Sequence, residues 1–383
     1  MSRPDTLVLA GALAQRPHHG GHTWVFLQYL LGLRRLGWDV LFVDWLHPDM
    51  CGTEAKVETS VNLRYLRDVF ERFGLGDAYA VTDVSTGTSY GVPRREMIER
   101  IRRSAALVNF MGYLDDEELL SAAPLRVFLD IDPGFGQMWR ALGLADPFAG
   151  HDLFVTVGEN VGSPECSIPT CGLDWITTPQ PVVLDEWPVV EDRGEGFTSV
   201  AAWRGPYGPI EYEGRTYGLR VHEFRRFVAL PRASGQRFEL ALDIDSAESG
   251  DLELLRVNGW QLAEPTTVAG DPWTYRDYIQ GSLAELMVAK NMYVQARTGW
   301  FSDRSICYLA SGRPVLAQDT GLAGRFADGD GLVLFSTLDE AREGTRRIAS
   351  DPGLHGRAAR SIAEDHFASD RVLSRLLVRL GIA

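Results

Sequence analysis

A histidine and an aspartate in the first half of the chain could act together as a general base. His22 follows Gly20 and Gly21 in a loop after a predicted buried strand. Asp130 and Asp132 end another predicted strand, and loops of this kind gather at the carboxyl edge of an open α/β sheet. A buried carboxylate needs a partner, and a histidine held by a carboxylate can take a proton from a hydroxyl group. We predict His22 as the base and Asp132 as its orienting partner, with Asp130 as an alternative; the plainer alternative is that Asp132 only caps a turn.

A second chemically informative stretch runs from residue 299 to residue 321, in the last third of the chain. Ser302 is a good N-cap and Gly312 a good C-cap for a short helix between them. The start of such a helix directs unpaired backbone N–H groups at an anion, and Arg304 lies in the same turn. We therefore predict a phosphate site made of Ser302, Asp303, Arg304 and Ser305.

Other residues would complete this site. Arg204 follows the first strand of the second half of the chain and would reach a diphosphate, unless it is a solvated surface charge. Trp300 and Tyr275 would stack on a base, although single aromatic residues more often pack in a core. Further contacts to a base or a sugar are predicted for Lys290, Asp319 and Thr320.

Two α/β segments must position these residues. A buried strand at 6–14, a helix from about 23 to 36 and a strand at 39–44 form a βαβ unit, which indicates a parallel sheet. Residues 61–103 are predicted to be mostly helical. Strands are predicted at 107–111, 126–132 and 153–157, and the pattern starts afresh with a strand at 197–202, a helix at 219–229 and a strand at 238–244.

The stretch 177–196 separates the two α/β patterns. It carries three prolines and two glycines among acidic residues, which is typical of a linker. The sequence therefore predicts an α/β protein with a Rossmann-like domain at 1–180, a linker at 181–196 and a second Rossmann-like domain at 197–365.

Composition excludes several functions. The 383 residues carry a formal net charge of −14, whereas a nucleic-acid surface needs a basic footprint. The four cysteines form no CxxC pair, so we predict reduced thiols and no zinc site. The start of the chain lacks the features of a signal peptide, and no apolar run has the roughly 18–20 residues of a membrane span. We expect a cytoplasmic protein that does not bind nucleic acid, and the sequence leaves oligomerisation open.

At this point the chain resembles glycosyltransferases of the GT-B fold. The loop Gly20–His22, followed by Leu27, Leu33, Gly37 and Val40, is similar to the opening loop and helix of that family. The later stretch is similar to the donor half of the retaining, glycogen-synthase-like branch, through Ala310, Gly312, Pro314 and Val315. The tail 366–383 resembles the last helix, which crosses back onto the first domain.

The resemblance implies two domains that face each other across a cleft. The second domain would bind a nucleotide-diphosphate sugar, and the first would bind an acceptor, such as a small molecule or natural product. In inverting natural-product enzymes a Gly-His pair supplies the base, which matches His22, with Asp132 or Asp130 as its partner. In the retaining branch a Gly-Gly pair contacts the donor diphosphate, which matches Gly20 and Gly21. Both readings stay open.

The chain also departs from the family pattern. The retaining branch has a glutamate before and within the helix that is predicted here between Ser302 and Gly312. This chain has Ser302, Asp303 and Arg304 at those positions, and Asp303 would take the ribose-binding role of that glutamate. The aspartate triplets at 130–132 and 243–245 resemble the DxD metal motif of another class of sugar-transferring enzymes, but such triplets arise by chance in acidic chains. We predict no metal and no cofactor. The alternatives are a nucleotide-sugar epimerase of the same fold and a binding protein without catalysis.

Overall fold

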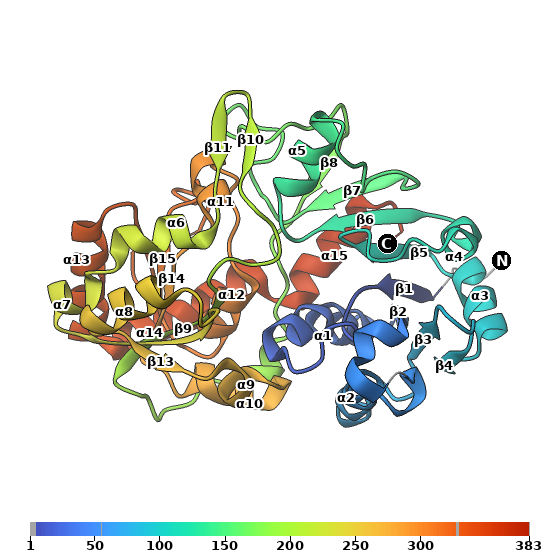
Figure 1. The fold of residues 1–383 in the computed structure, drawn as a ribbon, viewed down its shortest axis with the longest axis horizontal. Coiled ribbons are helices and arrows are strands. Elements are labelled where there is room, and N and C mark those ends of the chain that lie inside the picture. The colour runs from blue at the N-terminus through green and yellow to red at the C-terminus, as the bar shows by residue number, and fades with distance from the viewer. Residues whose placement is uncertain (1–4, 55, 327–328, 383) are drawn as a thin grey trace.

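The computed structural model describes residues 5–54, 56–326 and 329–382 (Figure 1). Their strands form two large sheets, one of eight strands and one of six, and a separate two-stranded hairpin. Helices cover the sheets, and α1 lies between the two halves of the molecule in Figure 1. The predicted α/β class with two Rossmann-like units is therefore confirmed.

The first sheet has the strand order β4-β3-β2-β1-β5-β6-β7-β8, and only β4 is antiparallel to its neighbour. Its strands are β1 (Thr6–Ala10), β2 (Asp39–Leu46), β3 (Tyr79–Asp83), β4 (Ser89–Gly91), β5 (Ala106–Phe110), β6 (Arg126–Asp130), β7 (Leu153–Thr156) and β8 (Trp175–Thr177). Its helices are α1 (Gly20–Arg35), α2 (Val61–Arg72), α3 (Arg94–Arg103), α4 (Glu117–Ala122) and α5 (Phe135–Ala141).

The second sheet is wholly parallel, in the order β13-β12-β9-β14-β15-β16. Its strands are β9 (Gly196–Ala202), β12 (Arg237–Asp243), β13 (Gln261–Ala263), β14 (Ala284–Met287), β15 (Val315–Gln318) and β16 (Leu332–Phe335). The helices of this half are α6 (Arg220–Phe224), α7 (Leu230–Ser234), α8 (Ser249–Val257), α9 (Pro265–Ala269), α10 (Pro272–Gln280), α11 (Asn291–Ala296), α12 (Asp303–Ala310), α13 (Leu338–Ser350), α14 (Pro352–Ile362) and α15 (Ser369–Arg379).

Each sheet has a point at which the strand order reverses. In the first sheet β1 lies between β2 and β5, and in the second β9 lies between β12 and β14. Ligands of open α/β sheets bind at such points, beyond the carboxyl ends of the strands. The loops that follow β1 and β9 are therefore where a bound molecule is expected.

Two antiparallel pairings were absent from the sequence prediction. Residues 61–103, predicted as mostly helical, contain β3 and β4, which are short. The loop after β9 contains the hairpin of β10 (Ile210–Tyr212) and β11 (Arg215–Tyr217). Its turn residues Glu213 and Gly214 both have positive φ, at 49° and 73°, as a tight hairpin turn requires.

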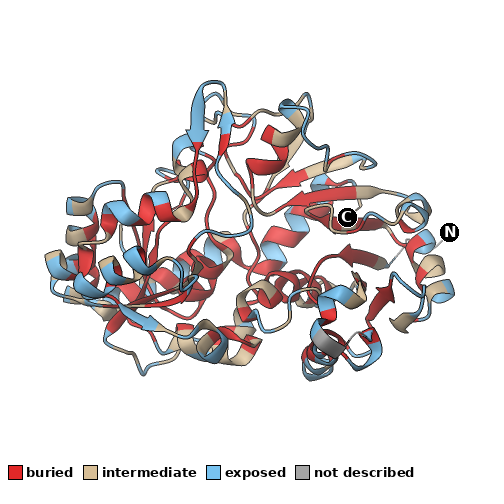
Figure 2. Cartoon of the chain, viewed as in Figure 1, coloured by how far each residue is buried: buried red, intermediate tan, exposed pale blue. Residues whose placement is uncertain are grey.

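The two halves share buried surface (Figure 2). A single apolar cluster includes residues of both halves, such as Trp24 on α1, Tyr275 on α10 and Ile306 on α12. The predicted linker takes part in it, because Val182, Val183 and Trp187 are fully buried and Trp187 contacts Trp24 with ring centroids 4.8 Å apart. The segment that joins the two sheets is thus packed along much of its length.

The last helix, α15, returns to the first half and packs on α1. The contact is close at Gly32 of α1, where an added Cβ would lie 2.6 Å from Leu373. Just before α15, Ala368 forms a bridge with Val182. The end of the chain thereby ties the second half to the first.

Candidate active site

A cleft of about 630 Å³ lies between the two halves, at the switch points of both sheets. The first half contributes the loop and helix start that follow β1, residues 18–22. The second half contributes the ends of β9 and β12, the start of α9 and the start of α12. The side chains relevant to chemistry in its wall are His22, Arg220, Asp243, Glu264, Asp303 and Arg304.

The start of α1 is one wall of the cleft and needs its two glycines for close packing. A Cβ added to Gly20 would lie 2.2 Å from the carbonyl oxygen of Asp271, and one added to Gly21 would lie 3.0 Å from the Tyr275 ring. The N-cap residue, His19, makes no side-chain cap hydrogen bond. The first-turn N–H groups of this 16-residue helix therefore face the cleft without a side-chain cap, an arrangement that favours an anion.

The start of α12 forms another part of the wall, as the sequence predicted. Ser302 caps the helix, since its Oγ accepts a hydrogen bond from the backbone N–H of Arg304 at 3.2 Å. Gly312 follows the helix with a φ of 68°. Ser302 and Ser305 are buried and support the helix start from within, while Asp303 and Arg304 reach the cleft.

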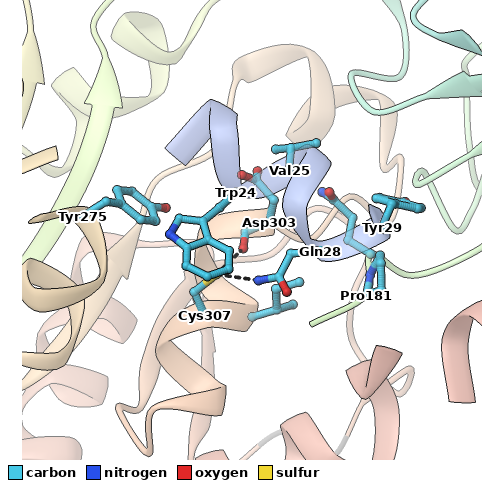
Figure 3. Close-up of a pocket in the computed structure, with 10 residues that line it drawn as sticks. Trp24, Val25, Gln28, Tyr29, Pro181, Tyr275, Asp303 and Cys307 are labelled. Carbon is cyan, nitrogen blue, oxygen red and sulfur yellow. Dashed lines mark hydrogen bonds between the residues drawn. The ribbon is translucent and has the colours of Figure 1, made fainter. Parts of the chain in front are cut away.

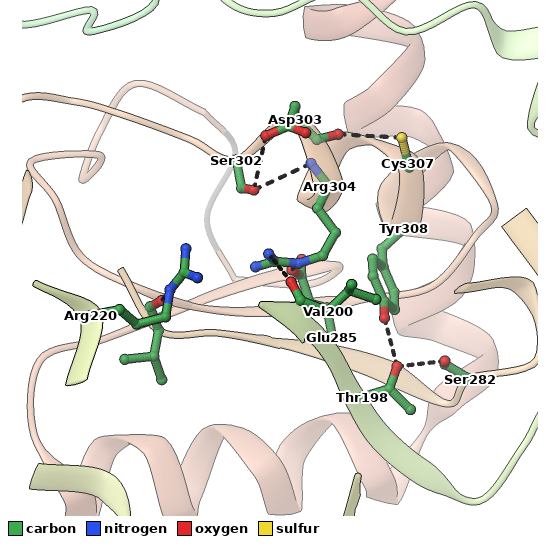
Figure 4. A network of polar contacts seen from close by, with 11 residues as sticks. Thr198, Val200, Arg220, Ser282, Glu285, Ser302, Asp303, Arg304, Cys307 and Tyr308 are labelled. Carbon is green, nitrogen blue, oxygen red and sulfur yellow. Dashed lines mark hydrogen bonds and ion pairs between the residues drawn. The ribbon is translucent and has the colours of Figure 1, made fainter. Parts of the chain in front are cut away.

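Arg304 is fixed from two sides (Figure 4). Its Nε lies 2.5 Å from Oε1 of Glu285 on β14, and its Nη1 donates to the carbonyl oxygen of Val200 on β9 at 2.6 Å. The side chains of Arg304 and Glu285 are 8% and 0% exposed. Because the guanidinium is held on these partners and still lines the cleft, its position is set before any ligand binds.

A second arginine, Arg220, was missed by the sequence analysis. It is the first residue of α6 and donates from Nε to the carbonyl oxygen of Val288 and from Nη1 to that of Ala202, each at 3.1 Å. Burial, followed by the charge of Arg304, lowers the pKa of Arg220 to about 10, so both arginines are charged at neutral pH. Two guanidinium groups therefore line the same cleft.

Asp303 connects the cleft with the packing between α1 and α12. A cavity of only about 10 Å³ lies there, lined by Asp303, Cys307, Gln28 and Trp24 among others (Figure 3). The Gln28 Oε1 accepts a hydrogen bond from the backbone N–H of Val183 at 2.7 Å, and the Gln28 Nε2 donates to the Cys307 sulfur at 3.7 Å. Burial raises the pKa of the Asp303 carboxyl group.

The predicted pairing of His22 with Asp132 is wrong. Nε2 of His22 lies 3.1 Å from the carbonyl oxygen of Ala12, and the ring packs edge-on against Phe26. Asp130, the alternative partner, is buried and accepts from Gln137 at 2.7 Å and from Thr156 at 2.9 Å. His22 does line the cleft, as predicted, but neither carboxylate orients its ring.

The environment of His22 makes it neutral near pH 7. Burial, followed by the charge of Arg16, lowers the pKa of His22 to about 4. A base works best when its pKa is near the working pH, so the ring is a weak base in this state.

This lowered pKa gives a prediction for stability. Between pH 6.5 and 4 the unfolded chain binds a proton at His22 that the folded protein does not, so this contribution is present above pH 6.5 and lost as the pH falls to 4. The variant His22→Gln should therefore lose less stability than the natural protein on acidification across this window. Urea unfolding at pH 7, 5.5 and 4.5 measures the difference; parallel pH dependences for the two proteins would contradict the lowered pKa.

Asp132 and Lys290 join the two halves instead of serving the cleft. The Lys290 ammonium group and the Tyr293 hydroxyl group, at the start of α11, both donate hydrogen bonds to the Asp132 carboxylate. The side chains of Lys290 and Asp132 are 17% and 24% exposed. Lys290 thus forms an ion pair between the domains, and its predicted contact with a base or sugar stays a prediction.

Lys290→Met should lower the free energy of unfolding by about 1–3 kcal/mol, because it leaves a half-buried carboxylate without its cation. Binding of a nucleotide diphosphate should be unchanged. Arg325→Met is the matched control, since the contact of Arg325 with Glu159 across the halves is longer, at 3.4 Å, and the Arg325 side chain is more exposed, at 34%; its loss should cost less than about 1 kcal/mol. Thermal and urea unfolding measure the stability of each variant, and titration with UDP measures its affinity. A large loss of UDP affinity in Lys290→Met would show that Lys290 contacts the donor, as the sequence predicted.

The remaining predicted contacts lie outside the cleft wall. Arg204 is exposed and held by Glu248, with Nη2 3.0 Å from Oε2. Trp300 is buried and stacks on Tyr293 with ring centroids 4.4 Å apart. Thr320 is buried and donates to the carbonyl oxygen of Trp300 at 2.6 Å, and Asp319 accepts from the backbone N–H of Leu322 at 2.7 Å. These three residues shape the loops around α12 from within, whereas Tyr275 does line the cleft.

No protein-family model and no curated protein matches the chain. Solved structures match along nearly its whole length. AviGT4, a glycosyltransferase involved in avilamycin A biosynthesis, is 16% identical and has a TM-score of 0.55, with 99% of this chain and 97% of that chain covered. The chain has the GT-B fold. An alpha-glucosyltransferase in complex with UDP is 10% identical, with a TM-score of 0.57 and coverage of 98% and 99%; the pneumococcal O-GlcNAc transferase GtfA, with UDP and GlcNAc, is 9% identical, with a TM-score of 0.53 and 98% of each chain covered.

The GT-B fold accounts for the position of the cleft, which lies where the carboxyl ends of two Rossmann-like sheets meet. Within the described residues, no group of three or more His, Cys, Asp or Glu side chains could hold a metal ion. None of the helices in the same parts of the chain is long and apolar enough to cross a membrane.

Proposed function

We propose that this protein is a glycosyltransferase that moves a sugar from a nucleotide-diphosphate donor to a hydroxyl group of an acceptor. The observation that carries the proposal is the convergence of Arg220, Arg304 and the starts of α1 and α12 on one cleft of the GT-B fold. Two fixed guanidinium groups, together with the first-turn N–H groups of α1, which lack a side-chain cap, are suited to a diphosphate. Proteins of similar fold that have been solved with bound UDP are consistent with such a donor.

The reaction breaks the bond between the anomeric carbon of the sugar and the diphosphate oxygen. The acceptor hydroxyl oxygen forms the new bond to that carbon, and its proton passes to an oxygen of the departing diphosphate. Negative charge grows on the departing diphosphate, where Arg220 and Arg304 would stabilise it. Removing one such preorganised donor typically costs about 10²–10³-fold in rate.

Three residues have further proposed roles. Asp303 would accept a hydrogen bond from the ribose of the donor, since it lines the cleft beside Arg304. His22 would contact the acceptor or the sugar as a neutral ring, whose Nδ1 has no hydrogen bond to any described residue. Gly20 and Gly21 would let the donor approach the start of α1.

The proposal is tested by incubating the full-length protein with UDP-, dTDP- and GDP-sugars and a panel of hydroxylated small molecules. Mass spectrometry should find a glycosylated acceptor and free nucleotide diphosphate in equal amounts. Conversion of the donor to another nucleotide sugar without an acceptor would instead indicate an epimerase. Binding of a nucleotide sugar without any turnover across the panel would favour the binding protein.

A further inference from the structure

A second chamber, of about 410 Å³, adjoins the cleft. The two spaces share His19, Ala202 and Asp243 in their walls. The chamber extends past these residues toward Arg16 in the loop after β1 and toward Arg204 in the loop after β9. A molecule seated in the chamber can therefore extend into the cleft, where the proposed reaction takes place.

The two arginines of this chamber differ in their partners. Arg204 is neutralised by Glu248, which contacts it through both carboxylate oxygens. Arg16 is exposed, and its guanidinium makes no ion pair or hydrogen bond with any residue that the structure describes. Its charge remains available to a ligand.

The loop that carries Arg16 is held firmly at its base. The buried carboxylate of Asp44 accepts from the backbone N–H of Ala14 at 2.7 Å and from the Gln15 amide at 2.8 Å. Asn62 donates to the carbonyl oxygen of Ala14 at 2.8 Å. The backbone next to Arg16 is thus fixed, which reduces the entropy lost when its side chain binds a ligand.

The charge of Arg16 acts on tyrosines of both domains. Burial raises the pKa of the phenols of Tyr113, after β5, and Tyr207, after β9, and the nearby charge of Arg16 acts against this. Tyr207 itself packs across the domains, with its ring centroid 5.1 Å from that of Phe135 and 4.9 Å from that of Trp139. The charge of Arg16 therefore reaches both domains from the wall of the chamber that adjoins the cleft.

We propose that Arg16 binds a carboxylate or phosphate group of the acceptor, and that the acceptor of this enzyme is therefore an anion. A planar guanidinium without a protein counterion matches either group through two parallel hydrogen bonds. The chamber holds the anionic group, and the hydroxyl group to be glycosylated lies in the cleft. That the bound anion is an acceptor substrate rests on the proposed function. Binding of the anion itself can be tested without catalysis.

The test compares three probes of similar size: 4-hydroxybenzoate, phenyl phosphate and the neutral 4-hydroxybenzamide. Each is titrated into the full-length protein by calorimetry, alone and with the nucleotide diphosphate that binds best. At least one anion should bind about 10- to 100-fold more tightly than the amide, and Arg16→Gln should abolish that preference. The double variant Arg204→Gln/Glu248→Gln, which removes the neighbouring ion pair as a neutral unit, should keep it.

The outcomes separate this inference from the proposed function. Equal binding of anions and amide, or a preference that survives Arg16→Gln, would overturn the anion site. A loss of nucleotide-diphosphate affinity in Arg16→Gln as large as that in Arg220→Gln would also overturn it, because Arg16 would then belong to the donor site. If no nucleotide diphosphate binds but the Arg16-dependent anion preference remains, the proposed function fails and the anion site stands.

Discussion

Replacement of Arg220 by glutamine is expected to lower kcat/KM for the nucleotide-sugar donor about 10²–10³-fold. Two nitrogens of this guanidinium are held by the carbonyl oxygens of Ala202 and Val288, and the rest of the group lines the cleft. Glutamine can still bond one carbonyl oxygen but cannot present a positive charge to the departing diphosphate. The loss should therefore appear in turnover and in affinity for the nucleotide diphosphate.

The fold should tolerate this change, because Arg220 has no carboxylate partner within hydrogen-bond distance in the described structure. Steady-state kinetics and calorimetry with the nucleotide diphosphate measure the effect, and thermal unfolding verifies that the variant is folded. Arg232→Gln, on the exposed side of α7, is the matched control and should behave like the natural protein. An Arg220→Gln variant with kcat/KM within about threefold of the natural value would remove Arg220 from the donor site.

Separating Arg304 from Glu285 is expected to cost about 3–5 kcal/mol of unfolding free energy in either single variant, Arg304→Gln or Glu285→Gln. The two side chains are 8% and 0% exposed, and each substitution leaves the other charge buried without its partner. The double variant Glu285→Leu/Arg304→Met removes both charges and should regain much of the lost stability.

In this double variant, stability should recover while binding of the nucleotide diphosphate should not. The double variant should fold but bind a nucleotide diphosphate poorly, because methionine at position 304 presents no positive charge to the cleft. Urea unfolding of the four proteins gives the stability that each single variant loses and the double variant regains, and titration with UDP gives the binding loss. A double variant with natural affinity for UDP would show that Arg304 is only structural, and single variants with losses below about 1 kcal/mol would contradict a tightly coupled buried pair.

The sequence predicted those parts of the fold that depend on local pattern. The apolar run of β1, the periodic helix α1 and the strand β2 were recognisable because burial on a parallel sheet leaves a continuous apolar strand. The cap of α12 was recognisable from Ser302, since capping depends on neighbouring residues. The hairpin β10–β11 and the short strands β3 and β4 were missed, because short antiparallel pairs leave little periodicity.

The candidate site was predicted only in part, for a spatial reason. Arg204 was predicted to reach the diphosphate because it follows β9 directly in the sequence. The hairpin that comes next returns the chain to the same end of β9 and places Arg220 there. Asp132 was expected at the end of a strand, but β6 ends at Asp130 and residues at the start of α11 in the other domain supply the partners of Asp132. Contacts between distant segments decide such pairings, and a local sequence pattern does not specify them.

A crystal structure of the full-length protein with a nucleotide diphosphate tests the central claim most directly. The diphosphate should lie between the two sheets, with its oxygens within hydrogen-bond distance of both Arg220 and Arg304 and next to the start of α1. A nucleotide bound elsewhere, or one whose phosphates touch neither arginine, would contradict the assignment of this cleft as the donor site.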